Sequence, residues 1–203
     1  MTVDEEIVTS GDILYQAYLD SCKASKWKAE TMKCSLNYLS VISRKQKELR
    51  NRTYKTGARR EFIANERGKE RPITSASIED RIARHAFYDN VVVPKLSAKL
   101  IYDNGASIKD KGLSFTRKRF EKHLHMLFNE NGCNDGWILF GDFSKYYDNI
   151  QHKPLIDDVS NVLQDEFSEW LYRENIETSR VDVSELSNKE IENYMNGVFN
   201  SVE

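Results

Sequence analysis

The chain has 203 residues, of which 39% are hydrophobic and 31% are charged. This length allows a buried core in one domain or two small ones, and the composition is typical of a strongly solvated globular protein. No apolar run approaches the ~20 residues that span a bilayer, and the start is unlike a signal peptide, so we expect a cytoplasmic protein without a membrane partner.

The net charge of −2 hides a division along the chain. Residues 41–141 carry 21 basic and 12 acidic side chains, whereas residues 142–203 carry 5 basic and 14 acidic ones. A basic middle section beside an acidic end favours a polyanionic partner bound by the middle. The alternative is two solvated faces whose charges pair with each other, and charge alone does not decide between them.

Two helices are predicted before residue 51. Ser10 is placed as the N-cap of the first. The second is expected to run from about residue 29 to residue 50, and its basic end either follows a phosphate backbone or forms a solvated face. Its apolar stripe, which we expect to pack in the core, consists of Met32, Leu36, Leu39 and Ile42.

A β-hairpin follows, with strands at residues 59–65 and 70–73 and a turn between them. Its cationic tip could offer donors to a triphosphate, although most such hairpins are simply solvated edges. Ser77 is then placed as the N-cap of a helix that we expect to stop at Pro94. Asp80 is expected to cap this helix or to pair with a nearby arginine.

A loop around residues 101–112 leads into another helix. Its predicted buried stripe consists of Leu113, Phe120, Leu124 and Leu127. The candidate contacts to an RNA or DNA backbone are Lys111, Arg117, Lys118 and Arg119. We do not expect a zinc site at His123 and His125, because helical residues two apart do not share a face.

The apolar run 137–140 is typical of a buried strand, and it ends at Asp142. A carboxylate there is costly unless it is neutralised, so Asp142 is expected to face a metal ion or an open cleft. The alternative is that Asp142 caps a helix that begins near Ser144. Beyond it, an acidic helix is predicted from residue 155, followed by short helices, the last opening at Ser187.

The stretch 138–152 resembles the first palm motif of reverse transcriptases from bacterial mobile elements (group II intron, retron and phage types). The matching positions are Asp142, Phe143, Tyr146, Tyr147, Asp148 and His152. The hairpin and the helix after it are similar to the fingers of the same family. The resemblance covers roughly residues 55–156 and implies an α+β fold, in which a helix-rich region with a β-hairpin precedes part of the palm of a truncated right-hand polymerase.

Four regions follow from this resemblance. They are an N-terminal helical region (1–54), the fingers (55–136), the first part of the palm (137–160) and an acidic helical insertion that leaves the palm incomplete (161–203).

The resemblance also implies roles for individual residues. Asp142 would be the catalytic carboxylate and would bind Mg²⁺ (or Mn²⁺) together with the backbone carbonyl of Phe143. Tyr147 would lie beneath the incoming sugar and favour deoxynucleotides. The triphosphate contacts would be Lys69, Arg71 and Arg81. The implied partners are an RNA template, a DNA primer and a dNTP.

Two departures limit this reading. The loop that carries Gly-Phe-Arg in intron-type relatives has Gly105 followed by Ala106 and Ser107. No Tyr-x-Asp-Asp motif occurs, and Asp157-Asp158 does not replace it, because that pair lies on helical periodicity about fifteen residues after Asp142. We therefore expect an N-terminal fragment of a longer polymerase that is inactive alone, and its exposed, incomplete palm is a candidate surface for dimer formation.

Two alternatives stay open. One is a non-catalytic nucleic-acid-binding module that derives from a reverse transcriptase and has lost the chemistry. The other is a structural helical protein in which the motif is accidental.

Overall fold

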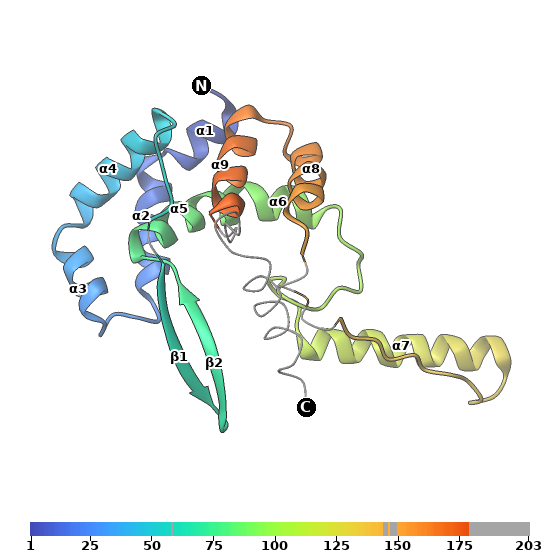
Figure 1. The fold of residues 1–203 in the computed structure, drawn as a ribbon. Coiled ribbons are helices and arrows are strands. Elements are labelled where there is room, and N and C mark those ends of the chain that lie inside the picture. The colour runs from blue at the N-terminus through green and yellow to red at the C-terminus, as the bar shows by residue number, and fades with distance from the viewer. Residues whose placement is uncertain (58, 144–145, 147–149, 179–203) are drawn as a thin grey trace, which may run out of the picture.

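The computed structural model describes residues 1–203 except residue 58, residues 144–145 and 147–149, and residues 179–203. Within that part the fold is α+β, with many helices and one two-stranded antiparallel sheet (Figure 1). The elements in chain order are α1 (Val3–Val8), α2 (Gly11–Cys22), α3 (Ala29–Leu36), α4 (Tyr38–Arg50), β1 (Arg60–Glu66), β2 (Lys69–Ser75), α5 (Ile78–Phe87), η1 (Tyr88–Val92), α6 (Val93–Ser97), α7 (Leu113–Asn131), α8 (His152–Leu163) and α9 (Glu166–Glu177).

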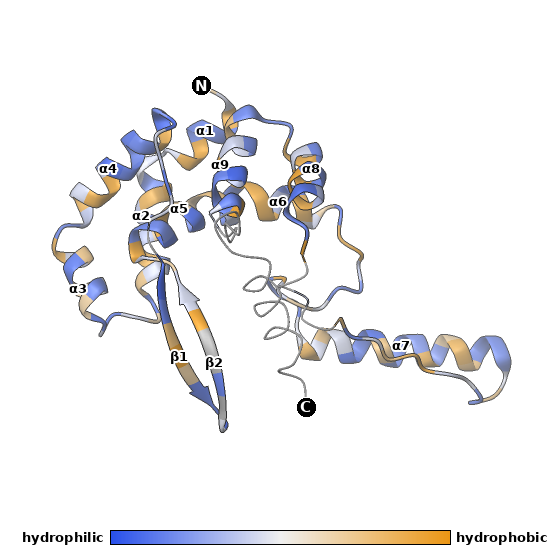
Figure 2. Ribbon diagram, viewed as in Figure 1, coloured by the Kyte–Doolittle hydropathy of each residue, from blue (hydrophilic) through white to orange (hydrophobic). Residues whose placement is uncertain are grey.

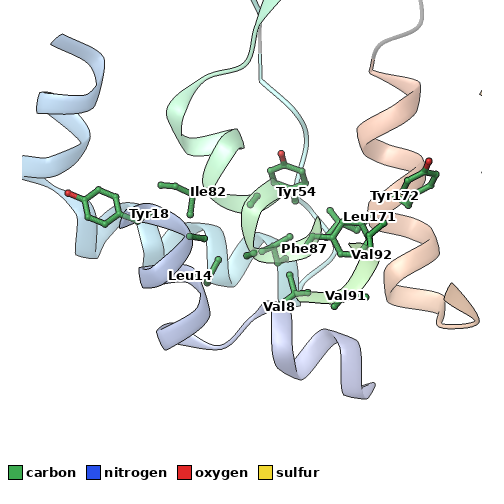
Figure 3. Close-up of a cluster of buried hydrophobic side chains, with 14 of the residues drawn as sticks. Val8, Leu14, Tyr18, Tyr54, Ile82, Phe87, Val91, Val92, Leu171 and Tyr172 are labelled. Carbon is green, nitrogen blue, oxygen red and sulfur yellow. The ribbon is translucent and has the colours of Figure 1, made fainter. Parts of the chain in front are cut away.

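Helix α5 lies at the centre of the core and packs against α1, α2, α3 and α4. Its sequence places Ile82 and Phe87 inward, and both side chains are fully buried. Figure 3 shows them in one buried cluster with Leu14 of α2 and Leu171 of α9, so the two ends of the described chain share one core. Burial of this apolar surface is the main stabilising contribution to the helical body.

The β-hairpin projects from the helical body (Figure 1). Its strands pair from Arg60 opposite Ser75 to Glu66 opposite Lys69. The two turn residues, Arg67 and Gly68, have φ angles of 52° and 81°. Positive φ at both positions matches the right-handed twist of the strands, which is why such short hairpins favour glycine here. The predicted hairpin is confirmed.

A buried carboxylate closes the base of this hairpin. Asp80, in the first turn of α5, is 2% exposed. Its Oδ1 accepts the Tyr54 hydroxyl at 3.2 Å, and its Oδ2 accepts the Gly57 N–H at 3.1 Å and the Ser77 hydroxyl at 2.7 Å. The Ser77 hydroxyl accepts the Asp80 N–H at 3.1 Å, which confirms the predicted N-cap. Ser77 is the capping residue, and the Asp80 carboxylate contributes to the cap by accepting the Ser77 hydroxyl.

Helices α8 and α9 close the core from the acidic end of the described chain. The Asp4 carboxylate of α1 is 6% exposed, and its Oδ2 accepts from Lys95 Nζ of α6 at 2.5 Å and from the Ser168 hydroxyl of α9 at 2.6 Å. Lys95 also donates to the carbonyl of Leu163, the last residue of α8, at 2.9 Å. One buried ion pair therefore joins four helices.

The helix predicted from residue 29 to residue 50 is two helices. Asn37 ends α3 and begins α4 with φ −128° and ψ 23°, outside helical geometry. The prediction that the apolar stripe packs in the core is wrong for three of its four residues, because Met32, Leu36 and Leu39 are 54%, 83% and 68% exposed. The opposite face, with Thr31 and Cys34, is the buried one, since it is the side that meets the body.

The chain also continues as a helix through Pro94, where a stop was expected. Residues Tyr88–Val92 form a π-helical turn, and Pro94 lies in the first turn of α6. Proline is tolerated there because the first N–H groups of a helix have no partner within the helix.

Helix α7 carries no buried residue, so the prediction of a buried stripe along it is wrong. Figure 2 shows apolar residues along this helix where it lies apart from the body. The predicted strand at residues 137–140 is also absent, and Trp137 and Leu139 are 102% and 96% exposed. A strand needs a neighbour for its backbone groups, and none of the described residues provides one here. Among the described helices, none is both long and apolar enough to cross a membrane.

We expect Lys95→Ala to lower the free energy of unfolding by roughly 1–3 kcal/mol, because it leaves the buried Asp4 carboxylate without its cation. Urea denaturation followed by circular dichroism measures this loss. Lys99→Ala, at an exposed position four residues on, is the matched control and should change stability by less than about 0.5 kcal/mol. Equal effects of the two substitutions would contradict a structural role for the ion pair.

Candidate functional site

Asp142 lies in an exposed, extended segment. Its Oδ1 accepts the N–H of Phe143 at 2.9 Å, and Phe143 is 79% exposed. The Phe143 ring lies 6.0 Å from the ring of Tyr146. The candidate carboxylate is therefore open to solvent, and the predicted strand that was to hold it is not formed.

The metal site predicted at Asp142 and Phe143 is incomplete in the described residues. No group of three or more His, Cys, Asp or Glu side chains in that part of the chain is arranged to hold a metal ion. Mg²⁺ in nucleotide sites takes one or two carboxylates and fills its shell with waters and phosphate oxygens. A single exposed carboxylate and one carbonyl supply only part of such a shell, so these residues do not form a metal site by themselves.

Three of the nucleotide-binding candidates fall partly or wholly outside the described residues. Lys69 and Arg71 lie in β2, opposite Glu66 and Ala64 of β1. Their side chains lie outside the part of the chain that the structure describes, and so does the whole of Tyr147. The backbone register of the hairpin places Lys69 directly after the turn and Arg71 two residues further along β2, near the tip as the sequence predicts.

Arg81, the fourth nucleotide-binding candidate, lies on α5 directly after the Asp80 network. Its Nε is buried and has no hydrogen-bond partner among the described residues. Arg81 shares a surface cavity of about 220 Å³ with Arg84, His85, Tyr88 and Asp89. Pockets for drug-sized ligands measure about 300–1,000 Å³, so this cavity is smaller than a typical ligand pocket.

Two of the groups that line this cavity already have partners. Arg84 donates from Nε to the Asn175 side chain at 3.3 Å, and His85 Nδ1 lies 2.7 Å from an Asp89 carboxylate oxygen. Burial raises the pKa of Tyr88 to about 12, so its hydroxyl remains protonated at neutral pH. The Nε of Arg81 is therefore the nitrogen in this group that is buried without a hydrogen-bond partner among the described residues, which supports the assignment of Arg81 as an anion contact.

The four nucleic-acid candidates near α7 are not equivalent. Lys111 Nζ lies 4.8 Å from the ring centroids of both Tyr102 and Phe115, and it donates to the Tyr102 carbonyl at 2.6 Å. The Arg119 guanidinium lies 5.0 Å from the centroid of the Tyr102 ring and is only partly exposed. These two cations stabilise the loop against α7.

The other two candidates lie on the exposed surface of α7. Arg117 pairs with Glu121 one turn on at 2.9 Å, an arrangement that water and a competing anion easily replace. Lys118 is exposed. Of the four candidates, Arg117 and Lys118 are therefore the two that remain accessible to a phosphate backbone.

Asp103 is the residue that sequence reasoning missed. Its carboxylate pairs with the Arg119 guanidinium through both oxygens and lies 2.6 Å from His123 Nε2. These hydrogen bonds, from Arg119 first and His123 second, lower the pKa of Asp103 to about 2. The available signal was the spacing of Arg119 and His123, which are four apart and share a helix face.

The structure thus forms two separate clusters, one around Arg81 and one around Tyr102. Within the described residues, no hydrogen bond, ion pair or ring contact joins Asp142 to either cluster. The candidate residues therefore lie in three places that no described contact joins.

We expect the Asp103 carboxyl to titrate near pH 2, well below its ordinary value of 3.8. Because folding depresses this pKa, the stabilisation is complete above the ordinary value and is lost as the pH falls through about 2. Carboxyl-carbon NMR measures the titration directly. Arg119→Gln should return the pKa of Asp103 towards its ordinary value. Arg117→Gln, two residues before Arg119 on the same helix, is the control and should leave the pKa lowered.

Comparison with known proteins adds no family to these observations, because no family model and no curated protein matches the sequence. The case for a function rests on the residues described above.

Proposed function

We propose that this chain is the N-terminal part, fingers and first palm motif, of an RNA-directed DNA polymerase. The observation that carries the proposal is the order in which the matching segments follow one another along the chain. A cationic hairpin and an Asp-Arg pair opening a helix precede the sequence Asp142-Phe143, two aromatics and His152. The hairpin and the helix both form, and the buried Asp80 network fixes one to the other.

The proposed roles follow from chemistry and position. The triphosphate would be held through charge-assisted hydrogen bonds by Lys69 and Arg71 of the hairpin and by Arg81, whose Nε has no partner among the described residues. Asp142 would share Mg²⁺ with the triphosphate and with carboxylates of the remaining palm, and Tyr147 would select the deoxyribose. Lys111 and Arg119 would shape the loop beside α7, while Arg117 and Lys118 would contact the primer or the template.

The rival proposal, a nucleic-acid-binding module without catalysis, is favoured by one observation. The candidate metal ligand is a single exposed carboxylate, and no further one is grouped with it in the described residues. A module of this kind would keep the basic surface of α7 and would have no need for Arg81 or Asp142.

We expect this chain alone to show no primer extension on a primed RNA template with Mg²⁺ and dNTPs. Nucleotidyl transfer needs two ions held by several carboxylates, and this sequence has no Tyr-x-Asp-Asp motif to provide the others. Incorporation of labelled dNTP above that of an Asp142→Asn control would contradict the expectation that the chain is inactive by itself.

Binding of a fluorescent dNTP in Mg²⁺ separates the two proposals. Arg81→Gln removes a charge-assisted contact and should weaken dNTP binding by roughly 10- to 100-fold. Lys153→Gln, at an exposed position on α8, is the control of equal charge change and should have no effect. Saturable binding that Arg81→Gln reduces supports the polymerase. Binding of primer-template without dNTP binding supports the module, and the absence of both overturns the two proposals together.

A further inference from the structure

An exposed tryptophan with lysines close to it in the sequence lies at the corner between α2 and α3. Trp27 is 74% exposed, and Lys28 Nζ lies 5.6 Å from the centroid of its ring. Lys26 and Lys33 are also exposed nearby in the sequence. A single exposed aromatic side chain is ordinary on a protein surface, so it is the combination of the ring with exposed lysines that indicates a partner.

The turn that carries Trp27 is held firmly from below. Ser25 and Thr31 are 3% and 1% exposed, and their hydroxyl oxygens lie 3.1 Å apart. The Ser25 hydroxyl also donates to the Ser21 carbonyl at 3.3 Å, and the Lys28 N–H donates to the Ser25 carbonyl at 2.9 Å. Buried hydrogen bonds on the inner side therefore present the indole outward on a fixed support, which lowers the entropy lost when it binds.

The charges around this indole are strongly biased towards positive. The nearest carboxylates in sequence on either side have partners, since Asp20 pairs with Lys23 at 2.5 Å and Glu30 accepts the Ile78 N–H at 2.7 Å. Within the described part of the chain, no carboxylate lies at ion-pair distance from Lys26, Lys28 or Lys33. An exposed ring among unpaired cations is complementary to a base stacked between phosphates.

The hydrogen bond that Glu30 accepts from Ile78 also shows where this surface lies relative to the hairpin. Ile78 is the first residue of α5, directly after the hairpin, so the start of α3 is docked at the hairpin base. A strand of nucleic acid that passes Trp27 would therefore run beside the base of the hairpin, on the same side of the body as α3 (Figure 1).

We propose that Trp27, Lys26, Lys28 and Lys33 form a binding surface for single-stranded nucleic acid. One base stacks on the indole, and the lysines neutralise the adjacent phosphates. Contacts of this kind do not depend on sequence, because every base has a π-face and every nucleotide a phosphate. The inference deepens the proposed function by adding a separate contact for the unpaired part of a template, but the surface itself does not depend on catalysis.

The competing occupant is a protein. Met32, Leu36 and Leu39 continue the exposed face and are apolar, which would suit a second copy of this chain. The unpaired lysines next to Trp27 oppose such a contact, because two copies would bring like charges together. Nucleic acid is therefore the occupant that the charges favour, and self-association is an outcome that the test can detect.

The experiment titrates the whole chain with fluorescein-labelled oligouridylate and oligothymidylate of about 12 nucleotides, within the range of single-strand site sizes. Trp27→Ala should weaken binding roughly 5- to 100-fold for both sugars, the effect of losing one stacked base. Trp137→Ala is the matched control, since Trp137 is fully exposed but lies outside the lysine cluster. It should leave the affinity unchanged. Tryptophan fluorescence should be quenched on binding in the Trp137→Phe variant and not in Trp27→Phe.

The salt dependence provides a second readout. Each phosphate contact to a single strand contributes about 0.7 to the slope of log K against log salt. Replacing Lys26, Lys28 and Lys33 by Gln should therefore reduce the slope by about 2. Replacing the exposed Lys47, Lys99 and Lys153 by Gln removes the same charge elsewhere and should change the slope much less.

Wild-type affinity in the Trp27→Ala variant, or an equal loss in the two lysine triples, would overturn the proposal. Self-association by sedimentation that Leu36→Ser abolishes, with oligonucleotide binding insensitive to Trp27→Ala, would assign the surface to a second copy instead. The result is separable from the proposed polymerase function. Loss of dNTP binding through Arg81 concerns that function alone, and loss of single-strand binding through Trp27 concerns this surface alone.

Discussion

The arrangement of the β-hairpin and α5 depends on one buried carboxylate. Asp80 accepts hydrogen bonds from Tyr54 and Gly57, which precede β1, and from Ser77, which follows β2. Burial first, and the charge of Asp80 second, raise the pKa of Tyr54, so the tyrosine remains a donor. An ionised carboxylate is tolerated inside the protein only when donors surround it, and here those donors come from both ends of the hairpin. The direction of the hairpin and the position of Arg81 on α5 are therefore linked.

The second constraint is that two apolar segments, residues 137–140 and α7, have no neighbour among the described residues that buries them. An isolated strand has two unpaired edges, and an amphipathic helix without a neighbour keeps its apolar stripe in water. The segment 137–140 and α7 both show this, with Leu139 and Leu113 almost fully exposed. Their sequences are typical of buried elements, so these surfaces fit a larger assembly in which further strands and helices would cover them. This is the physical argument behind the proposal of an incomplete palm.

The cations of the basic middle section divide by what surrounds them. Lys111 and Arg119 are used internally, against Tyr102 and Asp103, and hold the loop to α7. Cations that lack such partners, such as Lys118 on α7, are available to a polyanion. The basic character of residues 41–141 therefore overstates the surface that could meet a nucleic acid. The surface at Trp27 lies outside that section and would not be found from regional net charge.

Local signals determined much of the fold from the sequence by itself. Ser77 beginning a helix and the turn between the two hairpin strands are each set within a few residues, and the structure agrees with both. Which face of α3 is buried, whether residues 137–140 pair as a strand, and the capture of Asp103 by Arg119 and His123 were decided only by the tertiary structure. The spacing of Met32, Leu36 and Leu39 predicts one common face, but the break at Asn37 divides them between two helices and the body covers another side of α3. The physical reason is that periodicity is a property of one element, whereas burial, strand pairing and ion pairing each require a partner that is distant in the chain.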